Sequence, residues 1–408
     1  MAFEVDTQIP YGNVCDIEIR EGNDAVEVSF APAPHGGPET LWFCLRVRRA
    51  GDDPAAGMLR LVLKHHHNML GGHTPSALRP VIRYQGRAWQ RLPQGDLVPL
   101  PDGRTDIAWL VRAPEAALDI AFCYPYGVED VQTLVAETDG IWHVDTIGVS
   151  QGARPLLRLS NDYGGPGDQR PGLYVIARQH SGETPGSWVL DGFLRTMAEF
   201  GPEAPLVWAV PLSNIDGVES GDYGKDNFPY DLNRAWGRPP MRHEVSVFQR
   251  DMARWQSRCR PLLGIDFHAP GACETGGVYT YVPDPETDRA GHDAAMPWAF
   301  LTGDALTPDY AADQFARVVH YPSRWDTPSF RTYVWAQLGL PCITFETPYA
   351  MAGTQVLTQA DYREIGRRIA QGIVAGISKC TSPAWCAVRI SESVFLIFVR
   401  VCRIWSVT

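Results

Sequence analysis

The sequence lacks several patterns that would assign it to a common class of protein at once. Its nine cysteines form no CxxC pair, which argues against a disulfide framework and favours free thiols in a reducing compartment. Lys and Arg number 36 against 47 Asp and Glu, a net charge of −11, so we expect no nucleic-acid partner. The start, MAFEVDTQIPYGN, has no basic segment before an apolar core. It therefore predicts no secretory signal and a soluble cytoplasmic protein.

Long apolar runs are also missing. The most apolar stretch, SVFLIFVRVCRIW near the C-terminus, is interrupted by Arg400 and Arg403 and is too short to span a bilayer comfortably. We expect residues 379–408 to form an atypical tail outside the core and no membrane partner, with a membrane-surface anchor as the alternative.

The remaining chain divides into two patterns. Residues 1–130 alternate short β-rich runs such as AVEVSFAP and MLRLVLKH with Gly, Pro and Asp turns, which predicts an antiparallel β-sandwich domain. Residues 131–378 alternate apolar strands such as LYVIA with helical segments. This pattern predicts an α/β catalytic domain, with a mixed, mostly parallel sheet flanked by helices.

Three consecutive histidines lie in KHHHNMLGGH, residues 64–73. Adjacent side chains on a strand point to opposite faces, and no Cys or carboxylate lies close in sequence. We therefore expect a structural or loop role for this run rather than a metal site.

A metal site is instead predicted where apolar strands end. GLYVIA is followed by RQHSGE, which places His180 and Glu183 in a strand-to-helix loop, and LLGIDFH ends in His268. The helix after the loop is marked by Val189, Phe193 and Met197 at a spacing of four. Two histidines and a carboxylate form the ligand set of a catalytic zinc ion with one open position. Taken alone, each histidine is more often structural, and only their combination favours a metal.

Two further segments suit hydrolysis beside such a metal. Glu346 ends the apolar strand CITFE, where a buried carboxylate needs a partner or a function and can serve as a general base. Asn233 and Arg234 lie in YDLNRAW, and an Arg fork suits recognition of a carboxylate. The structural alternatives are a loop-capping or Arg-paired Glu and a solvated surface Arg.

These motifs, HSGETPGSWVLDGFL, SNIDGVESGDY followed by DLNRAW, GIDFHAPG and TFETPY, resemble in their order the M14 zinc carboxypeptidases, and most closely the cytosolic carboxypeptidase (deglutamylase-like) branch. The N-terminal segments LWFCLRVR and IAFCYPYGVEDVQ resemble the β-sandwich that precedes the catalytic domain in that branch. The resemblance covers about residues 10–377. It implies that one Zn²⁺ per chain is bound by His180, Glu183 and His268. It also implies that Glu346 is the general base and acid, and that Asn233 and Arg234 hold the terminal carboxylate of a peptide.

The resemblance is incomplete at several positions. The branch usually has an Arg after the Tyr that matches Tyr223, where it stabilises the oxyanion, but this chain has Gly224 and then Lys225. Lys225 is the candidate substitute in this catalytic role, although it lacks the Arg fork. The mobile Tyr of the family is not placed clearly: Tyr333 and Tyr321 are the candidates. Arg331 resembles the basic residue that lines the side-chain pocket in deglutamylase-like members, which implies a preference for an acidic C-terminal residue.

The sequence therefore predicts a zinc metallocarboxypeptidase that acts on the C-terminus of a peptide or protein. Two alternatives stay open. One is a zinc deacylase of small N-acyl amino acids, and the other is a non-catalytic binder of peptide C-termini, which the missing Arg favours.

Overall fold

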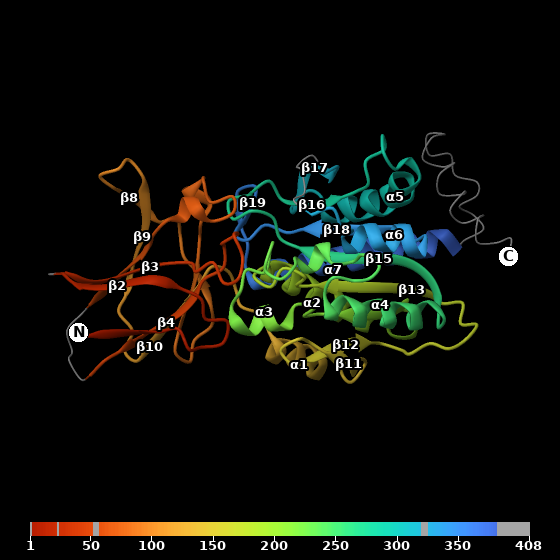
Figure 1. The fold of residues 1–408 in the computed structure, drawn as a ribbon, viewed down its shortest axis with the longest axis horizontal. Coiled ribbons are helices and arrows are strands. Elements are labelled where there is room, and N and C mark those ends of the chain that lie inside the picture. The colour runs from red at the N-terminus through yellow and green to blue at the C-terminus, as the bar shows by residue number, and fades with distance from the viewer. Residues whose placement is uncertain (1, 23, 52–56, 320–324, 382–408) are drawn as a thin grey trace.

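A computed structural model of the chain describes residues 2–22, 24–51, 57–319 and 325–381. A strand-rich part built by the first third of the chain lies at one end of the molecule, and a larger part with helices on both sides of a sheet lies at the other (Figure 1). Helix α1 (Val128–Glu137) begins before residue 131 and contacts α2 (Thr184–Glu199) of the larger part. The predicted domain boundary at 130/131 therefore falls inside a helix.

The N-terminal part contains two five-stranded sheets. Their strand orders are β1-β4-β10-β6-β7 and β2-β3-β5-β9-β8. Most neighbouring strands are antiparallel, but β3 and β5 pair in parallel from Ala25↔Met58 to Phe30↔Leu63. The prediction of a purely antiparallel arrangement is wrong for this pair, because the chain crosses to the other sheet as β4 and returns as β5 in the direction of β3. The strands are β1 (Phe3–Asp6), β2 (Cys15–Glu21), β3 (Ala25–Ala31), β4 (Cys44–Arg49), β5 (Met58–Leu63), β6 (Val81–Tyr84), β7 (Gln90–Arg91), β8 (Asp96–Pro99), β9 (Thr105–Arg112) and β10 (Ala117–Ala121); two short 3₁₀ turns, His66–Asn68 and Pro75–Ala77, lie between β5 and β6.

The histidine run lies in the loop after β5. His66 is buried, with Nδ1 2.8 Å from the carbonyl of Gly72 and Nε2 3.1 Å from Thr105 Oγ1. His65 Nε2 lies 3.4 Å from Asp16 Oδ2, and His67 is exposed. The run is a turn rather than the strand that we assumed. The polar partners of His66 nevertheless support the loop role that we expected.

The larger part is organised around one eight-stranded mixed sheet of order β11-β12-β14-β13-β15-β18-β16-β17. Its centre is parallel, because β13 pairs in parallel with β14 and β15, and β15 with β18. Antiparallel pairs join β11 to β12, β12 to β14 and β16 to β18. The mixed, largely parallel sheet agrees with the prediction. Its strands are β11 (His143–Val149), β12 (Pro155–Ser160), β13 (Pro171–Ala177), β14 (Leu206–Val210), β15 (Arg260–His268), β16 (Val278–Tyr281), β17 (Ala311–Arg317) and β18 (Cys342–Glu346).

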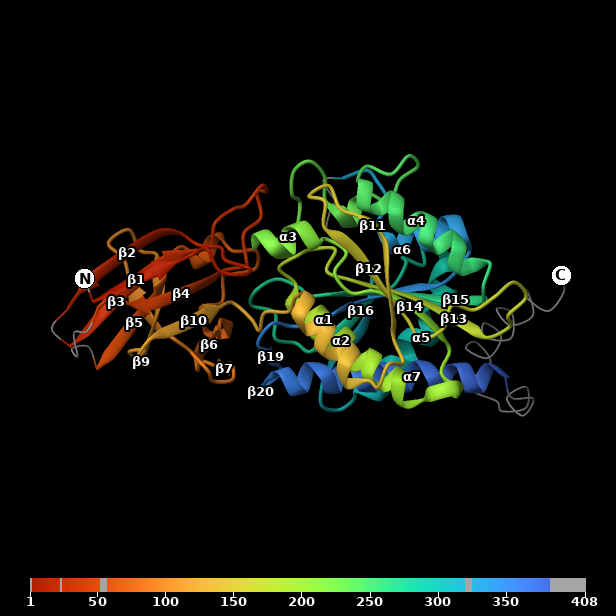
Figure 2. The same ribbon diagram turned by 90° about the horizontal axis from the view of Figure 1, so that it is seen from below.

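Helices cover both faces of this sheet. Figure 2 shows α1, α2, α5 and α7 on one side and α4 and α6 on the other. The predicted apolar positions of α2 (Val189, Phe193, Met197) and of α7 (Ile365, Ile369, Ile373) are fully buried. The remaining elements are α3 (Ile215–Ser220), α4 (His243–Gln256), α5 (Arg289–Leu306), α6 (Phe330–Leu338), α7 (Gln359–Thr381), the small strands β19 (Met351–Ala352) and β20 (Gln355–Val356), and 3₁₀ turns at Gly201–Glu203 and Leu232–Arg234.

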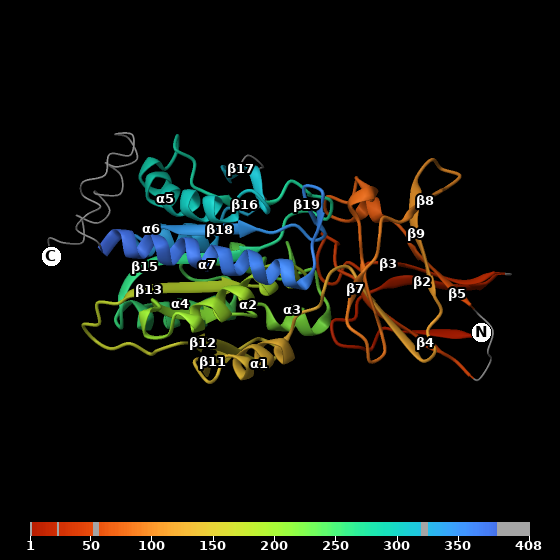
Figure 3. The ribbon, with the colours of Figure 1, turned by 180° about the vertical axis from the view of Figure 1, so that it is seen from behind.

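Helices α2 and α7 pack in direct backbone contact and run side by side over the sheet (Figure 3). A Cβ atom on Gly192 would lie 2.0 Å from the carbonyl oxygen of Arg363, and one on Gly366 would lie 1.9 Å from that of Val189. Only glycine permits this approach. Helix α7 extends past residue 378, and the predicted tail beyond Thr381 lies outside the described residues.

The carboxyl ends of the central strands bring the predicted site residues together. His268 ends β15 and pairs in register with Glu346, which ends β18. Strand β13 lies on the other side of β15, so the loop after Ala177 starts at the same edge. In open α/β sheets this edge is where ligands bind. Within the ranges that the structure describes, no helix is long and apolar enough to cross a membrane.

Candidate metal centre and active site

The loop that joins β13 to α2 presents the first two predicted ligands. It begins with Arg178, whose φ of 62° is uncommon for a residue with a side chain. The buried guanidinium stabilises this conformation, because Nε donates to the carbonyl of Ser181 at 2.7 Å and a terminal nitrogen donates to the carbonyl of Tyr126 at 2.9 Å. Glu183 is the residue before the first turn of α2. The loop is therefore fixed by hydrogen bonds at its start and by the helix at its end.

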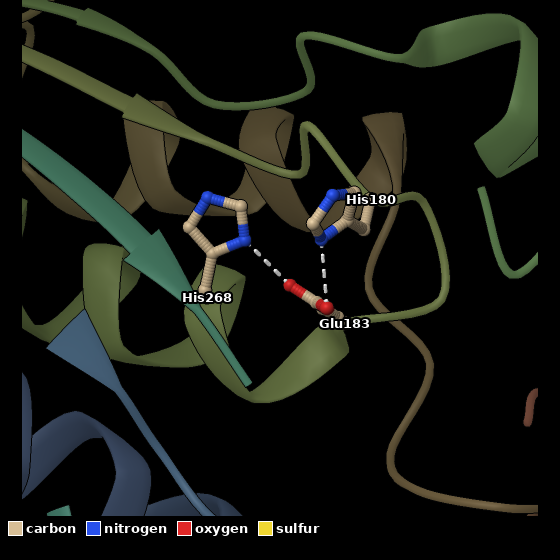
Figure 4. A group of neighbouring side chains, drawn as sticks. All are labelled: His180, Glu183 and His268. Carbon is tan, nitrogen blue, oxygen red and sulfur yellow. Dashed lines mark hydrogen bonds and ion pairs between the residues drawn. The ribbon is translucent and has the colours of Figure 1, made fainter. Parts of the chain in front are cut away.

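His180, Glu183 and His268 form one compact buried group (Figure 4). His180 Nδ1 lies 2.8 Å from one carboxylate oxygen of Glu183, and His268 Nδ1 lies 2.7 Å from the other. One candidate ligand atom from each residue falls within 4.8 Å of the others. Two imidazole nitrogens facing a single carboxylate match a three-ligand site for a metal ion. This group could hold a metal.

Two carboxylates that the sequence analysis missed lie behind the histidines. Asp231 Oδ1 is 3.4 Å from His180 Nε2, and Asp266 Oδ2 is 3.0 Å from His268 Nε2. Carboxylates in this position orient metal-binding imidazoles. Asp266 had a signal in the sequence, because residues two apart on a strand share a face. Asp231 comes two residues before Asn233, but only the folded loop shows that it turns back to His180.

The charges in this group are strongly coupled. Burial alone would favour neutral forms, but Glu183 and Asp231 raise the pKa of His180, and Asp266 and Glu183 raise that of His268. The same histidines hold the pKa of Glu183 well below its usual range against the effect of burial. Positive charge on the histidines thus stabilises the buried carboxylates. A bound cation would serve the same purpose.

Glu346 lies next to this group but makes no hydrogen bond through its buried Oε2 atom. Burial, with a smaller contribution from Glu183, raises the pKa of Glu346 to about 8, while His268 and Lys225 act in the opposite direction. A cation bound by the neighbouring ligands would lower this pKa and favour the ionised form. Glu346 therefore lies where a carboxylate could accept and return a proton beside the metal-binding group.

Gly224 occupies the position where the branch that the sequence resembles usually has an Arg, and its conformation explains why it is a glycine. Its φ is +83°, and a Cβ atom would lie 2.4 Å from Ser181 Oγ. An Arg side chain does not fit this backbone. Lys225, the next residue, is close enough to Glu346 to influence its pKa, so the predicted cation is near the site although its role stays a prediction.

Asn233 and Arg234 lie in the 3₁₀ turn beside the histidines. Asn233 Nδ2 is 3.1 Å from His268 Nε2, and its Oδ1 accepts from the backbone of Phe330 at 3.1 Å. Arg234 donates to the carbonyl of Asn233 at 3.0 Å. Asn233 thus contacts the group, and Arg234 is attached beside it. The Asn233 amide is already engaged, so the guanidinium of Arg234 is the stronger candidate for binding a substrate carboxylate.

The remaining predicted residues are placed less favourably. Arg331 lines a cavity of about 250 Å³ with Pro341 and Cys342, where β18 begins, whereas Glu346 ends that strand. Tyr333 is 3% exposed, with its ring centroid 5.5 Å from that of Trp236. This interior position does not suit a mobile substrate-binding side chain. Tyr321 lies outside the described residues.

The N-terminal part contacts the segments that surround the site. Asn13 donates to the carbonyl of Gly221 at 2.7 Å, and the backbone of Phe228 donates to that of Gly36 at 2.7 Å. The loop between these contacts carries Lys225. Ala272, just after His268, donates to the carbonyl of Leu70 at 2.8 Å. The two parts of the molecule therefore meet next to the candidate site.

Comparison with known proteins finds relatives named as carboxypeptidases. No family model matches the chain. Cytosolic carboxypeptidase 6 of Homo sapiens is 26% identical over 327 residues, covering 72% of this chain and 63% of the relative. Cytosolic carboxypeptidase 2 of Xenopus tropicalis is 39% identical over 215 residues, covering 44% of this chain and 21% of the relative. The chain is thus similar in sequence to cytosolic carboxypeptidases.

Solved structures show the same fold at lower sequence identity. A metallo-carboxypeptidase from Burkholderia cenocepacia is 18% identical with a TM-score of 0.71, and the match covers 93% of this chain and 99% of that structure. The chain thus has the metallocarboxypeptidase fold. It spans less than two thirds of the length of the curated cytosolic carboxypeptidases that it matches.

Proposed function

We propose that the protein is a zinc metallocarboxypeptidase that hydrolyses the C-terminal peptide bond of peptides or proteins. The observation that carries the proposal is the edge of the sheet where His180, Glu183 and His268 converge and where Glu346 pairs in register with His268. A metal-binding group and a candidate base thus occupy adjacent strand ends.

The residues fit zinc through their chemistry. Two neutral imidazoles and one carboxylate are the ligands of many catalytic zinc ions, with a fourth position left for water or substrate. Zinc bound there supplies Lewis acidity, which polarises a carbonyl group and makes water more acidic. We propose one Zn²⁺ per chain, held by His180, Glu183 and His268.

Glu346 is the proposed general base and acid. Its buried Oε2 atom has no hydrogen-bond partner among the described residues, so the atom is available to accept a proton from the attacking water. The same carboxyl group then donates that proton to the departing amine, which leaves Glu346 ionised for the next cycle. Lys225 is the proposed cation that stabilises the developing oxyanion.

Arg234, with Asn233, is the proposed binding group for the terminal carboxylate of the substrate. A charge-assisted bond to this carboxylate restricts cleavage to the end of a chain, and holding the scissile bond in place contributes to rate. A preference for an acidic last residue stays a prediction, and the placement of Arg331 at the start of β18 lends it no support.

Two features of context complete the proposal. The N-terminal sheets form a β-sandwich domain that supports the loops around the site. The name cytosolic, given to the matched relatives, favours a cytoplasmic location for this chain as well.

A peptide mixture tests the activity. Zinc-loaded protein is incubated with peptides that differ only in their last residue, and the products are analysed by mass spectrometry. We expect the wild type to remove single C-terminal residues and the Glu346→Gln variant to remove none. Peptides with an amidated C-terminus should resist cleavage, because Arg234 then has no carboxylate to bind. Zinc binding without cleavage of any peptide would contradict the proposed activity and favour a deacylase or a binding protein.

A further inference from the structure

A buried chain of hydrogen bonds lies behind the candidate metal centre. Trp236 Nε1 donates to Gln179 Oε1 at 2.7 Å, and Gln179 Nε2 donates to Asp266 Oδ2 at 2.8 Å. The same Asp266 oxygen lies 3.0 Å from His268 Nε2. All three residues of the chain are 0% exposed. Three fully buried polar side chains in contact with one another need a structural or functional reason, because burial of polar groups is costly.

The direction of these bonds is determined by chemistry. An indole N–H can only donate, so the oxygen of the Gln179 amide must face Trp236. The amide nitrogen then faces Asp266, whose Oδ2 atom accepts the bond. Each link thus selects the orientation of the next one. Buried hydrogen-bonded networks of this kind favour a single arrangement of side chains.

These hydrogen bonds join segments that are far apart in sequence. Gln179 immediately precedes His180, Asp266 comes two residues before His268, and Trp236 follows Asn233 and Arg234 in the same segment. Gln179 therefore ties the loop of one candidate ligand to the strand of the other. Asn233 Nδ2, at 3.1 Å, is a second neighbour of His268 Nε2. An Nε2–H that donates to Asp266 cannot also accept from this amide, so the contact with Asp266 is the one that can orient the imidazole on this side, while Nδ1 faces Glu183.

We propose that Trp236, Gln179 and Asp266 act as a positioning relay that sets the spacing and orientation of the two histidine ligands of the metal. The inference rests on the proposed metal site but not on the proposed peptidase activity. Gln179 is the central member, because it is the only one that touches the other two. The relay contacts His268 at Nε2, on the side of that ring away from Glu183, and its residues act on the metal through the ligands.

The test measures metal affinity and geometry rather than activity. The apparent dissociation constant for Zn²⁺ is obtained by competition with a chromophoric chelator, and the Co²⁺-substituted protein gives an absorption spectrum that reports ligand geometry. We expect Asp266→Asn to weaken Zn²⁺ binding by about 10- to 100-fold, as is typical for partners of metal ligands, and to change the Co²⁺ spectrum. Gln179→Met, of similar length, should have the same effect to a smaller degree.

Asp251→Asn is the matched control. Asp251 is also buried, 2.7 Å from Arg158 and 3.1 Å from Tyr174, but it lies outside the relay. This variant should lower the melting temperature of the metal-free protein and leave Zn²⁺ affinity and the Co²⁺ spectrum unchanged. A general loss of stability is thereby separated from a loss of ligand positioning.

A double variant tests whether the residues act as one unit. Because Gln179 is expected to act through Asp266, Gln179→Met should add no further loss of affinity in the Asp266→Asn background. Additive losses, or variants with wild-type affinity and spectrum, would overturn the relay. If these variants fail to fold, Trp236→Phe removes the N–H donor together with the five-membered ring that carries it, and an unchanged spectrum in that variant would overturn the relay as well. A wild-type protein that takes up no metal would reject both the site and the relay, whereas a metal-binding protein without peptidase activity would reject only the activity.

Discussion

Two groups of histidines in this molecule differ in how closeness in sequence relates to a shared partner in space. His65, His66 and His67 are consecutive, yet the buried ring of His66 is hydrogen-bonded to a backbone carbonyl and to Thr105. His180 and His268 are far apart in sequence, yet their Nδ1 atoms face the two oxygens of one carboxylate. The concentrated run forms a turn, and the separated pair forms the candidate metal centre.

The difference follows from where each group lies in its sheet. The run occupies a loop between β5 and β6, where Nδ1 and Nε2 of His66 face a backbone carbonyl and a hydroxyl group. The pair lies at the carboxyl ends of β13 and β15, which are parallel neighbours, so one edge brings together side chains from distant segments. Sheet topology, rather than the local density of histidine, therefore determines which histidines face a common carboxylate.

Loss of a ligand in the separated pair should have the largest effect. His180→Ala leaves His268 and Glu183 as two ligands, fewer than the three that catalytic zinc sites use. We expect the content of zinc to fall from one ion per chain to none after gel filtration with a mild chelator, and activity to fall to background. Elemental analysis of the purified protein measures the metal. Retention of a full equivalent of zinc would mean that the histidine run, or another group, holds it.

Glu346→Gln should stop peptide hydrolysis without affecting the binding of zinc by His180, Glu183 and His268. The amide keeps the size of the side chain but cannot accept the proton of the attacking water. We expect kcat to fall by about 10²- to 10⁴-fold, the usual contribution of a general base, with the zinc content unchanged. The measurement is peptide hydrolysis followed by mass spectrometry on the zinc-loaded variant. A variant with wild-type kcat would assign the base to another residue.

The sequence was sufficient to single out the candidate ligands and the candidate base, because each of them ends or follows an apolar strand and belongs to a recognisable motif, and the structure places them at one edge of the sheet. It also indicated the helices, since the buried faces of α2 and α7 have a clear period. It could not show that Arg331 lies near the start of β18 rather than near Glu346 at its end. The fifteen residues between Arg331 and Glu346 do not determine how helix α6 is turned about its own axis. The parallel pairing of β3 and β5 was missed for a related reason. The chain passes through the other sheet between these two strands, and no local sequence pattern shows which strands become neighbours.

The relay residues mark the limit of sequence reasoning more clearly. Asp266 shares a strand face with His268, so its proximity could have been inferred from the alternation of strand side chains. The bond between Gln179 and Trp236 depends on how a loop and a 3₁₀ turn meet in space, and no spacing in the chain encodes it. Long-range polar contacts of this kind emerge only from the packed structure.

Substitution of His66 should affect stability and leave the metal unchanged. His66→Ala removes a ring that is 4% exposed and leaves the carbonyl of Gly72 and the hydroxyl of Thr105 without that partner. Leaving buried polar groups unsatisfied costs about 1–3 kcal/mol each, so we expect a clear fall in the free energy of unfolding in urea. The zinc content should stay at one per chain. A stability equal to that of the wild type would contradict the structural role of His66.

His67→Ala should have the smallest effect and gives the sharpest test of the comparison. The side chain is exposed, and its Nε2 atom is 3.4 Å from Arg104. Partial burial and, to a smaller degree, the charge of Arg104 both lower the pKa of the His67 imidazole. A neighbouring guanidinium opposes the approach of a metal cation, and exposed substitutions usually change stability by less than about 0.5 kcal/mol. We therefore expect unchanged unfolding and unchanged zinc content, measured at saturating Zn²⁺ by elemental analysis. If the wild type instead bound two zinc ions and this variant one, the run would be a second metal site, and the density of histidine in the sequence would have been the better guide after all.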